Sequence, residues 1–315
     1  MAHAQPHAVD QVFKRWDPSW RVNPMQIVGH PALKQAPFVD IQNVADYCNT
    51  GRGEKVKRNP PRIGRCFSPW RTSFLFWHEP LKDLGIAYKL ALVLQMPPTA
   101  DCPEALISGL IFQAESKGGP YTVLSGMFSL AVPEGGLLEE SDDGMQMFKM
   151  VIAGDARSSV YADGFCAIRP IAESIVGKDY VAALDLVKDV LPDWAKDSQA
   201  DVQILLSAFS FAHCKNVQVA EAGRTSPPPR WTKELGVPSV KYSVVKIDTR
   251  MSKRTSGPHT DTGRHTSLHI VRGHFKHYTP EKPLLGKHVG TYWWPDNTRG
   301  DSAVGEVKKS YKVEP

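Results

Sequence analysis

Residues 86–132 read IAYKLALVLQMPPTADCPEALISGLIFQAESKGGPYTVLSGMFSLAV. The stretch contains three apolar runs of strand length: Ile86–Gln95, Ala105–Ala114 and Tyr121–Val132. Prolines and glycines separate the runs, and such punctuation is typical of a β-meander. Because some runs are nearly continuous in hydrophobicity, we expect both faces of the sheet to be covered. The stretch therefore predicts a buried β-meander over about residues 85–132.

The chain before this meander is irregular in composition. Ile41–Cys48 is expected to form a short helix, because Asn49-Thr50-Gly51 ends its apolar pattern. Residues 51–62 are polar, basic and proline-containing, which predicts an exposed basic loop. Residues 69–80 are rich in aromatic side chains and bounded by prolines, which favours a strand.

Helical periodicity dominates from about residue 168 to residue 214. One amphipathic stripe runs from Val181 to Val190, and Pro192 limits that helix. The apolar run within Val202–Cys214 predicts a buried core helix. Beyond it the period becomes two, and we expect four strands: Val240–Asp248, Ser267–Tyr278, His288–Trp294 and the short Tyr311–Glu314.

These elements predict an α+β fold in which mainly antiparallel β-regions flank a central helical block. The segment GRTSPPPR at residues 223–230 has the composition of a linker. We therefore expect an α+β N-terminal region at residues 1–222 and a basic, β-rich C-terminal region at residues 231–315.

The net charge of +5 over 315 residues conceals an uneven distribution. Residues 1–100 hold 13 basic and 7 acidic side chains (+6), and residues 101–214 hold 7 and 17 (−10). Residues 215–315 hold 18 and 9 (+9). Two basic flanks around an acidic centre indicate either an anionic partner or lobes that neutralise each other. The distance in the folded protein between residues 52–71 and residues 272–299 distinguishes these interpretations. Segments that line one groove favour an anionic ligand, and segments at opposite ends favour mutual neutralisation.

The sequence indicates a cytoplasmic protein. It has no run of 18 apolar residues, and its N-terminus lacks the pattern of a secretory signal. Its five cysteines are widely spaced and form no C-x-x-C, which suits a reducing compartment and argues against a cysteine-based zinc site. Walker A, dinucleotide-binding and nucleophile-elbow motifs are absent, so no cofactor is indicated.

The strongest local feature is a cluster of histidines, basic residues and aromatic residues. Six of the 11 histidines fall within residues 259–288. If Leu268–Tyr278 is one strand, alternation places Arg272, His274 and Lys276 on one face, as a row of donors suited to phosphate. The predicted phosphate-binding residues are Arg264, Arg272, His274, Lys276, Lys287 and Arg299. The predicted stacking residues are Tyr278, Tyr292 and Trp294.

Other interpretations of the cluster remain open. A polar β-face with ordinary packed aromatics has the same pattern, and of Trp293 and Trp294 at least one is expected in the core. His269, His274 and His277 are candidate catalytic residues for a nuclease or phosphodiesterase that uses paired histidines as acid and base. The histidine spacings are not specific for a metal, so we expect no metal site.

Three segments resemble a family of phage- and prophage-associated proteins that also occurs in actinobacterial genomes. They are Phe211–Val217 (FAHCKNV), Leu268–Tyr278 (LHIVRGHFKHY) and Leu284–Trp294 (LLGKHVGTYWW), followed by Arg299-Gly300. The resemblance covers residues 205–300 well and the N-terminal half loosely. It implies a phage-linked protein of the bacterial host cytoplasm and supplies no catalytic residues.

Three hypotheses follow from the sequence. The first is a phage-linked accessory protein whose basic C-terminal region binds nucleic acid or a phosphorylated ligand. The second is a histidine-dependent nuclease or phosphodiesterase. The third is a counter-defence or regulatory protein that binds a host protein through its acidic middle region.

Overall fold

The computed structural model of the protein describes most of the expected elements. The described residues are 27, 30–33, 35–49, 63–81, 86–98, 104–115, 122–140, 146–147, 150–152, 159–179, 181, 192–221, 242–247, 267–271, 273–294, 297–299 and 301–306.

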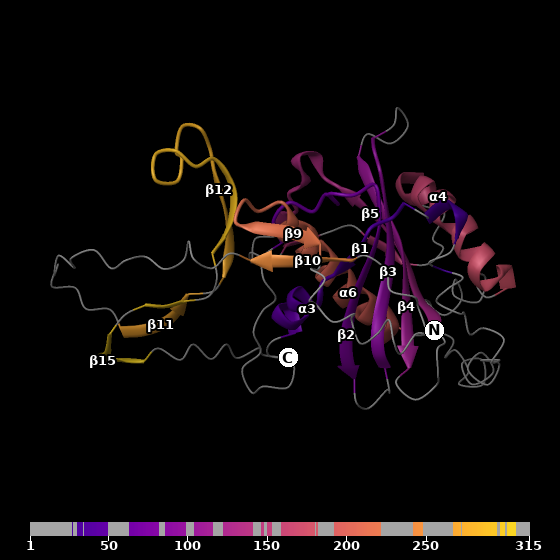
Figure 1. Ribbon diagram of the computed structural model, residues 1–315, viewed down its shortest axis with the longest axis horizontal. Coiled ribbons are helices and arrows are strands. Elements are labelled where there is room, and N and C mark those ends of the chain that lie inside the picture. The colour runs from indigo at the N-terminus through magenta and orange to yellow at the C-terminus, as the bar shows by residue number, and fades with distance from the viewer. Residues whose placement is uncertain are drawn as a thin grey trace, which may run out of the picture.

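An eight-stranded sheet in the order β8-β5-β4-β3-β2-β1-β10-β9 forms the body of the molecule (Figure 1). Its strands are β1 (Phe38–Asp40), β2 (Thr72–Leu81), β3 (Ile86–Met96), β4 (Ala105–Glu115), β5 (Thr122–Val132), β8 (Met150–Ile152), β9 (Val217–Glu221) and β10 (Tyr242–Ile247). Strands β2 to β5 pair antiparallel in sequence order, and β8 pairs antiparallel with β5. The predicted meander is therefore confirmed.

The other half of the sheet departs from a simple meander. The short strand β1 runs parallel to both β2 and β10, and β9 pairs antiparallel with β10. Helix α3 (Gln42–Asn49) connects β1 to the chain that leads into β2. The side chain of Asp40 accepts a hydrogen bond from the Gln42 N–H at 2.8 Å, and burial raises the pKa of this carboxyl. The sheet is thus mixed at its β1 side.

Helices cover both faces of the sheet. Helix α4 (Ser159–Val176) packs its buried Ile168 and Ala172 against the face that carries Leu92 and Leu110. Helix α6 (Pro192–Ala212) lies on the opposite face, where its apolar residues share a second core with alternate residues of the same strands. Figure 1 shows α4 on one side of the sheet and α6 and α3 on the other. This arrangement explains why strands β3 to β5 are almost continuously apolar.

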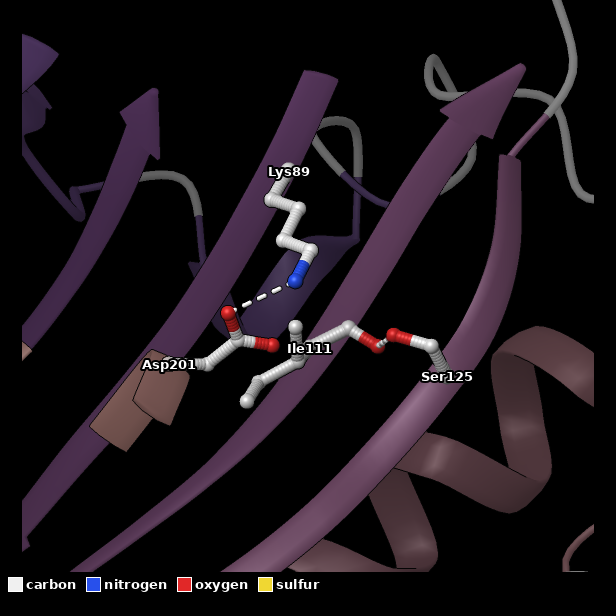
Figure 2. Close-up of polar contacts among 4 residues, drawn as sticks. All are labelled: Lys89, Ile111, Ser125 and Asp201. Atoms are coloured by element: carbon white, nitrogen blue, oxygen red, sulfur yellow. Dashed lines mark hydrogen bonds and ion pairs between the residues drawn. The ribbon is translucent and has the colours of Figure 1, made fainter. Parts of the chain in front are cut away.

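A β-bulge in β5 sets which side chains face which helix. Ile111 pairs with Gly126 and Phe112 pairs with Leu124, so Ser125 is the extra residue. The Ser125 hydroxyl donates a hydrogen bond to the Ile111 carbonyl at 3.0 Å (Figure 2). Before the bulge Leu124 faces α4, and after it Met127 faces α4, because one extra residue reverses the alternation.

A buried ion pair joins α6 to the sheet. The Lys89 Nζ of β3 lies 2.7 Å from the Asp201 Oδ1 of α6, and each side chain is 7% exposed (Figure 2). Alternation along β3 places Lys89 on the same face as Ala91 and Val93, which is the face that α6 covers. The pair therefore lies inside a largely apolar layer.

Three smaller sheets complete the described structure. They are β14-β11-β15, with β11 (Ser267–Val271), β14 (Asn297–Arg299) and β15 (Asp301–Glu306); the hairpin of β12 (His274–Tyr278) and β13 (Gly290–Trp294); and β6-β7, with β6 (Glu139–Glu140) and β7 (Gln146–Met147). Single-turn 3-10 helices occupy Pro31–Leu33 and Glu134–Gly136.

The structure is of mixed α and β content, consistent with the expected α+β class, but it corrects one strand. Ser267–Tyr278 is not a single strand, because β11 ends at Val271 and β12 begins at His274 in a different sheet. Gly273 between them is buried. The alternation expected across the whole of 268–278 therefore does not hold.

Several expected features lie outside the described residues. These are the basic loop at 51–62, most of the helical stripe at 181–190, the linker-like segment at 223–230 and the final strand at 311–314. Strand β10 follows the linker-like segment and pairs with β1, so one sheet contains residues from both expected regions. In the part of the chain that the structure describes, no helix is long and apolar enough to cross a membrane.

Candidate functional site

The β12–β13 hairpin carries most of the predicted ligand-binding residues that the structure describes. Its register pairs His274 with Trp294, Lys276 with Tyr292, and Tyr278 with Gly290. Residues that pair across an antiparallel ladder point to the same face. One face therefore holds five of the predicted residues: His274, Lys276, Tyr278, Tyr292 and Trp294.

The opposite face attaches the hairpin to the core. Trp293 is 3% exposed, and its ring centroid lies 4.6 Å from that of Phe275 and 4.8 Å from that of Phe211 in α6. Tyr47 of α3 meets the Trp293 ring edge-on at 5.3 Å. The expectation that one of the two adjacent tryptophans lies in the core is confirmed for Trp293.

A turn after α6 binds the free edge of β13. The Asn216 Nδ2 donates a hydrogen bond to the Trp293 carbonyl at 2.8 Å, and the Trp293 N–H donates to the Asn216 Oδ1 at 2.9 Å. The Lys215 N–H donates to the Thr291 carbonyl at 2.8 Å. We call this arrangement the Asn216 clamp. It fixes β13 through its backbone, so the outward side chains need not contribute to anchoring.

Gly290 at the start of β13 is required by this clamp. Its φ of 121° lies in a region that L side chains rarely adopt, and a Cβ added there would lie 3.2 Å from the Cγ and Cε of Lys215. The glycine therefore permits the turn and the strand to approach closely.

Part of the N-terminal basic flank runs next to the hairpin. A Cβ added at Gly64 would lie 3.2 Å from the Phe275 ring, so residue 64 packs directly on β12. The Ser210 hydroxyl donates to the Arg65 carbonyl at 3.1 Å, and the His213 Nε2 lies 2.8 Å from the Phe67 carbonyl oxygen. Arg65 itself is exposed. The described part of the first basic flank thus meets the second one at this hairpin.

The outer face combines exposed charge with aromatic rings. Lys276 is exposed, and its Nζ lies 5.1 Å from the centroid of the Tyr278 ring, within the range of a cation–π contact. Tyr278 is half-buried and meets Tyr292 edge-on at 5.9 Å. Tyr292 is only 7% exposed, so it supports Tyr278 and offers little free surface for a stacked base. Among the described residues, the Trp294 indole N–H has no acceptor.

The remaining predicted residues lie elsewhere. His269 of β11 pairs directly with Arg299 of β14, which brings these two positions together in the three-stranded sheet. Lys287 lies in the exposed loop between β12 and β13. Arg264 and Arg272 lie outside the described residues.

The candidate catalytic histidines are not brought together. His274 pairs with Trp294 on the outer face, whereas His277 pairs with Thr291 on the opposite face. The His277 Nδ1 is hydrogen-bonded to the Thr291 hydroxyl at 3.0 Å. His269 belongs to a different sheet. Within the described ranges, no three His, Cys, Asp or Glu side chains are grouped so that they could hold a metal ion.

The cysteines near the clamp have structural environments. Burial raises the pKa of both the Cys66 and the Cys214 thiol to about 12, so neither forms a thiolate near neutral pH. The Cys66 thiol donates to the Gly136 carbonyl, and the Cys214 thiol donates to the Ser210 carbonyl. Cys166 of α4 is exposed.

Sequence reasoning missed the residues that build the site. Asn216 and Lys215 are part of the FAHCKNV segment, but nothing in that segment indicates a partner 77 residues away in the chain. The glycine before the Tyr-Trp-Trp motif was a detectable signal, because a glycine inside a strand pattern marks a close backbone approach.

No family model, no curated protein and no solved structure matches this chain.

Proposed function

We propose that the outer face of the β12–β13 hairpin binds the phosphates of a nucleic acid or of a phosphorylated ligand. We further propose that the protein is a phage-linked accessory protein of the bacterial cytoplasm. The observation that carries the proposal is the two-sided hairpin. One face is anchored by Phe275 and Trp293, and the other presents Lys276 beside a tyrosine pair.

The charge around the hairpin supports an anionic ligand. Residues 273–294 contain three lysines and three histidines but a single acidic residue, Glu281. Lys276, Lys282 and Lys287 are all exposed. Exposed lysines spaced along a β-ribbon suit repeated contacts with a phosphate backbone, because each ammonium neutralises one phosphate.

The nearness of the two basic flanks supports the same proposal. Arg65 is exposed directly after Gly64, which packs on Phe275. Positive charge from sequence segments about 200 residues apart thus lies in neighbouring parts of the fold. This favours an external anionic partner over mutual neutralisation of distant lobes.

The test is the salt dependence of binding to a fluorescent 20-nucleotide DNA, as a single strand and as a duplex. Affinity should fall steeply between roughly 50 and 200 mM salt. Lys276→Gln should weaken binding several-fold and reduce the slope of log K against log salt by about 1. Lys178→Gln is the matched control, because Lys178 is also exposed but lies after α4.

Two outcomes would count against the proposal. Binding that stays flat with salt, or no binding to either DNA or to a phosphorylated nucleotide, would remove it. Equal loss of affinity in Lys276→Gln and Lys178→Gln would show that any surface lysine contributes to binding and that the hairpin is not a specific binding site. Hydrolysis is not part of the proposal, because His274 and His277 lie on opposite faces of β12.

A further inference from the structure

The loop between β12 and β13 ends in a turn with an unusual residue. Leu284 and His288 form an isolated β-bridge around Leu285-Gly286-Lys287, with hydrogen bonds of 2.8 and 2.9 Å between their backbones. The Lys287 N–H also donates to the Leu284 carbonyl. Leu285 has a φ of 53° and Gly286 a φ of 73°. Positive φ at both central residues is the signature of a type I′ turn.

Leucine is a poor choice for this position on two independent grounds. The left-handed conformation is sterically unfavourable for a residue with a Cβ, and turns of this type favour Asn, Asp or Gly. The Leu285 side chain is also 78% exposed, the largest exposure among the exposed large hydrophobic residues that the structure describes. An apolar residue that is both strained and exposed at the tip of a loop indicates that its side chain contacts a binding partner.

The surroundings of Leu285 identify the class of partner. Lys287 and Lys282 are exposed within three residues of it, and His288 follows. The one acidic residue of the loop, Glu281, is held by a hydrogen bond from the Thr279 side chain, which lowers the pKa of its carboxyl. One leucine with the partly exposed Val289 is too little apolar area for a stable protein interface or for membrane anchoring.

A single apolar side chain flanked by cations is suited to insertion between the base pairs of duplex DNA. Proteins that bind the minor groove of DNA insert one such side chain between two base pairs, unstack them and kink the duplex. We propose that the β12–β13 hairpin is a DNA-bending arm that grips duplex DNA through its lysines and inserts Leu285 as a wedge between base pairs. This inference rests on the proposed function and narrows its ligand to duplex DNA.

The experiment measures bending by energy transfer between dyes at the two ends of a 30-bp duplex. Wild-type protein should raise the transfer efficiency on binding. Leu285→Asn should abolish the increase and weaken duplex binding about tenfold. Asparagine tolerates the left-handed conformation, so this variant should have an equal or higher Tm. Leu285→Met keeps an apolar wedge and should retain bending.

Leu137→Asn is the matched control, because Leu137 is 59% exposed but lies outside the β12–β13 hairpin and should not affect bending. Salt-dependent duplex binding with unchanged bending in Leu285→Asn would overturn the wedge but leave the proposed function intact. Equally tight binding to the single strand would also overturn it. Loss of binding to anionic lipid vesicles in Leu285→Asn, with duplex binding unchanged, would assign the tip to a membrane instead. Absence of salt-dependent binding by wild-type protein to any DNA would remove both proposals.

Discussion

Replacing Lys89 with methionine should lower the free energy of unfolding by about 3–5 kcal/mol, and Asp201→Leu should do the same. Each change removes the ion-pair partner of the other charge, which stays buried between α6 and the sheet, where both side chains are 7% exposed. The 2.7 Å contact in Figure 2 is the interaction that is lost. Chemical denaturation followed by tryptophan fluorescence measures the effect.

The double variant Lys89→Met/Asp201→Leu distinguishes a charge effect from a packing effect. It should be within about 2 kcal/mol of wild-type stability, or more stable, because both charges of the pair are removed together. Lys178→Met is the control for losing an exposed lysine and should change stability by less than about 0.5 kcal/mol. A double variant whose loss equals the sum of the two single losses would contradict this account of the pair.

Asn216→Ala should destabilise the protein by about 2–4 kcal/mol and loosen the β12–β13 hairpin more than the rest of the fold. The substitution leaves both the N–H and the carbonyl of Trp293 without their partner, at a buried position. Hydrogen exchange should therefore speed up more in residues 274–278 and 290–294 than in β2 to β5. Affinity for DNA should fall as well, since the binding face loses its fixed position.

Asn43→Ala is the matched control for the clamp. The Asn43 side chain also donates to a backbone carbonyl, that of Val245, but Asn43 is exposed and this bond joins α3 to β10 rather than to the hairpin. Its loss should cost about 0.5–1.5 kcal/mol and leave exchange in the hairpin unchanged. Equal exchange of the hairpin in wild type and in Asn216→Ala would show that the clamp does not hold it.

The meander could be predicted because its signal is local. Each of β3, β4 and β5 is an apolar run between turn residues, and its bounds follow within a residue or two. The near-continuous hydrophobicity correctly indicated two covered faces. The bulge at Ser125 was not predicted, because a single extra residue alters the alternation without leaving a distinct composition.

The β1 side of the sheet could not be predicted for a different reason. β1 has three residues, and its parallel partners β2 and β10 are separated from it by about 30 and 200 residues. Long-range pairing of short strands depends on tertiary packing, and no local pattern encodes it. The same holds for the break at Gly273, where an apparently continuous strand pattern is divided between two sheets.

The candidate site was predicted in part. The sequence placed Lys276 and His274 on one face of a strand, and the register adds Tyr278, Tyr292 and Trp294 to that face. The near-complete burial of Tyr292 was not foreseen, because it depends on tertiary neighbours such as Tyr278, which the register brings next to it. The role of Leu285 was not predicted. A leucine in a short apolar segment does not reveal that its backbone is left-handed and its side chain exposed.

The most direct test of the central claim is to locate the DNA-contacting residues by hydrogen exchange. Wild-type protein is compared with and without a saturating 20-bp duplex at low salt. We expect protection in residues 274–294, with Lys276 and the Leu285 turn inside the protected segment, and unchanged exchange in β3, β4 and α4. Protection confined to other parts of the chain, with residues 274–294 unchanged, would contradict it.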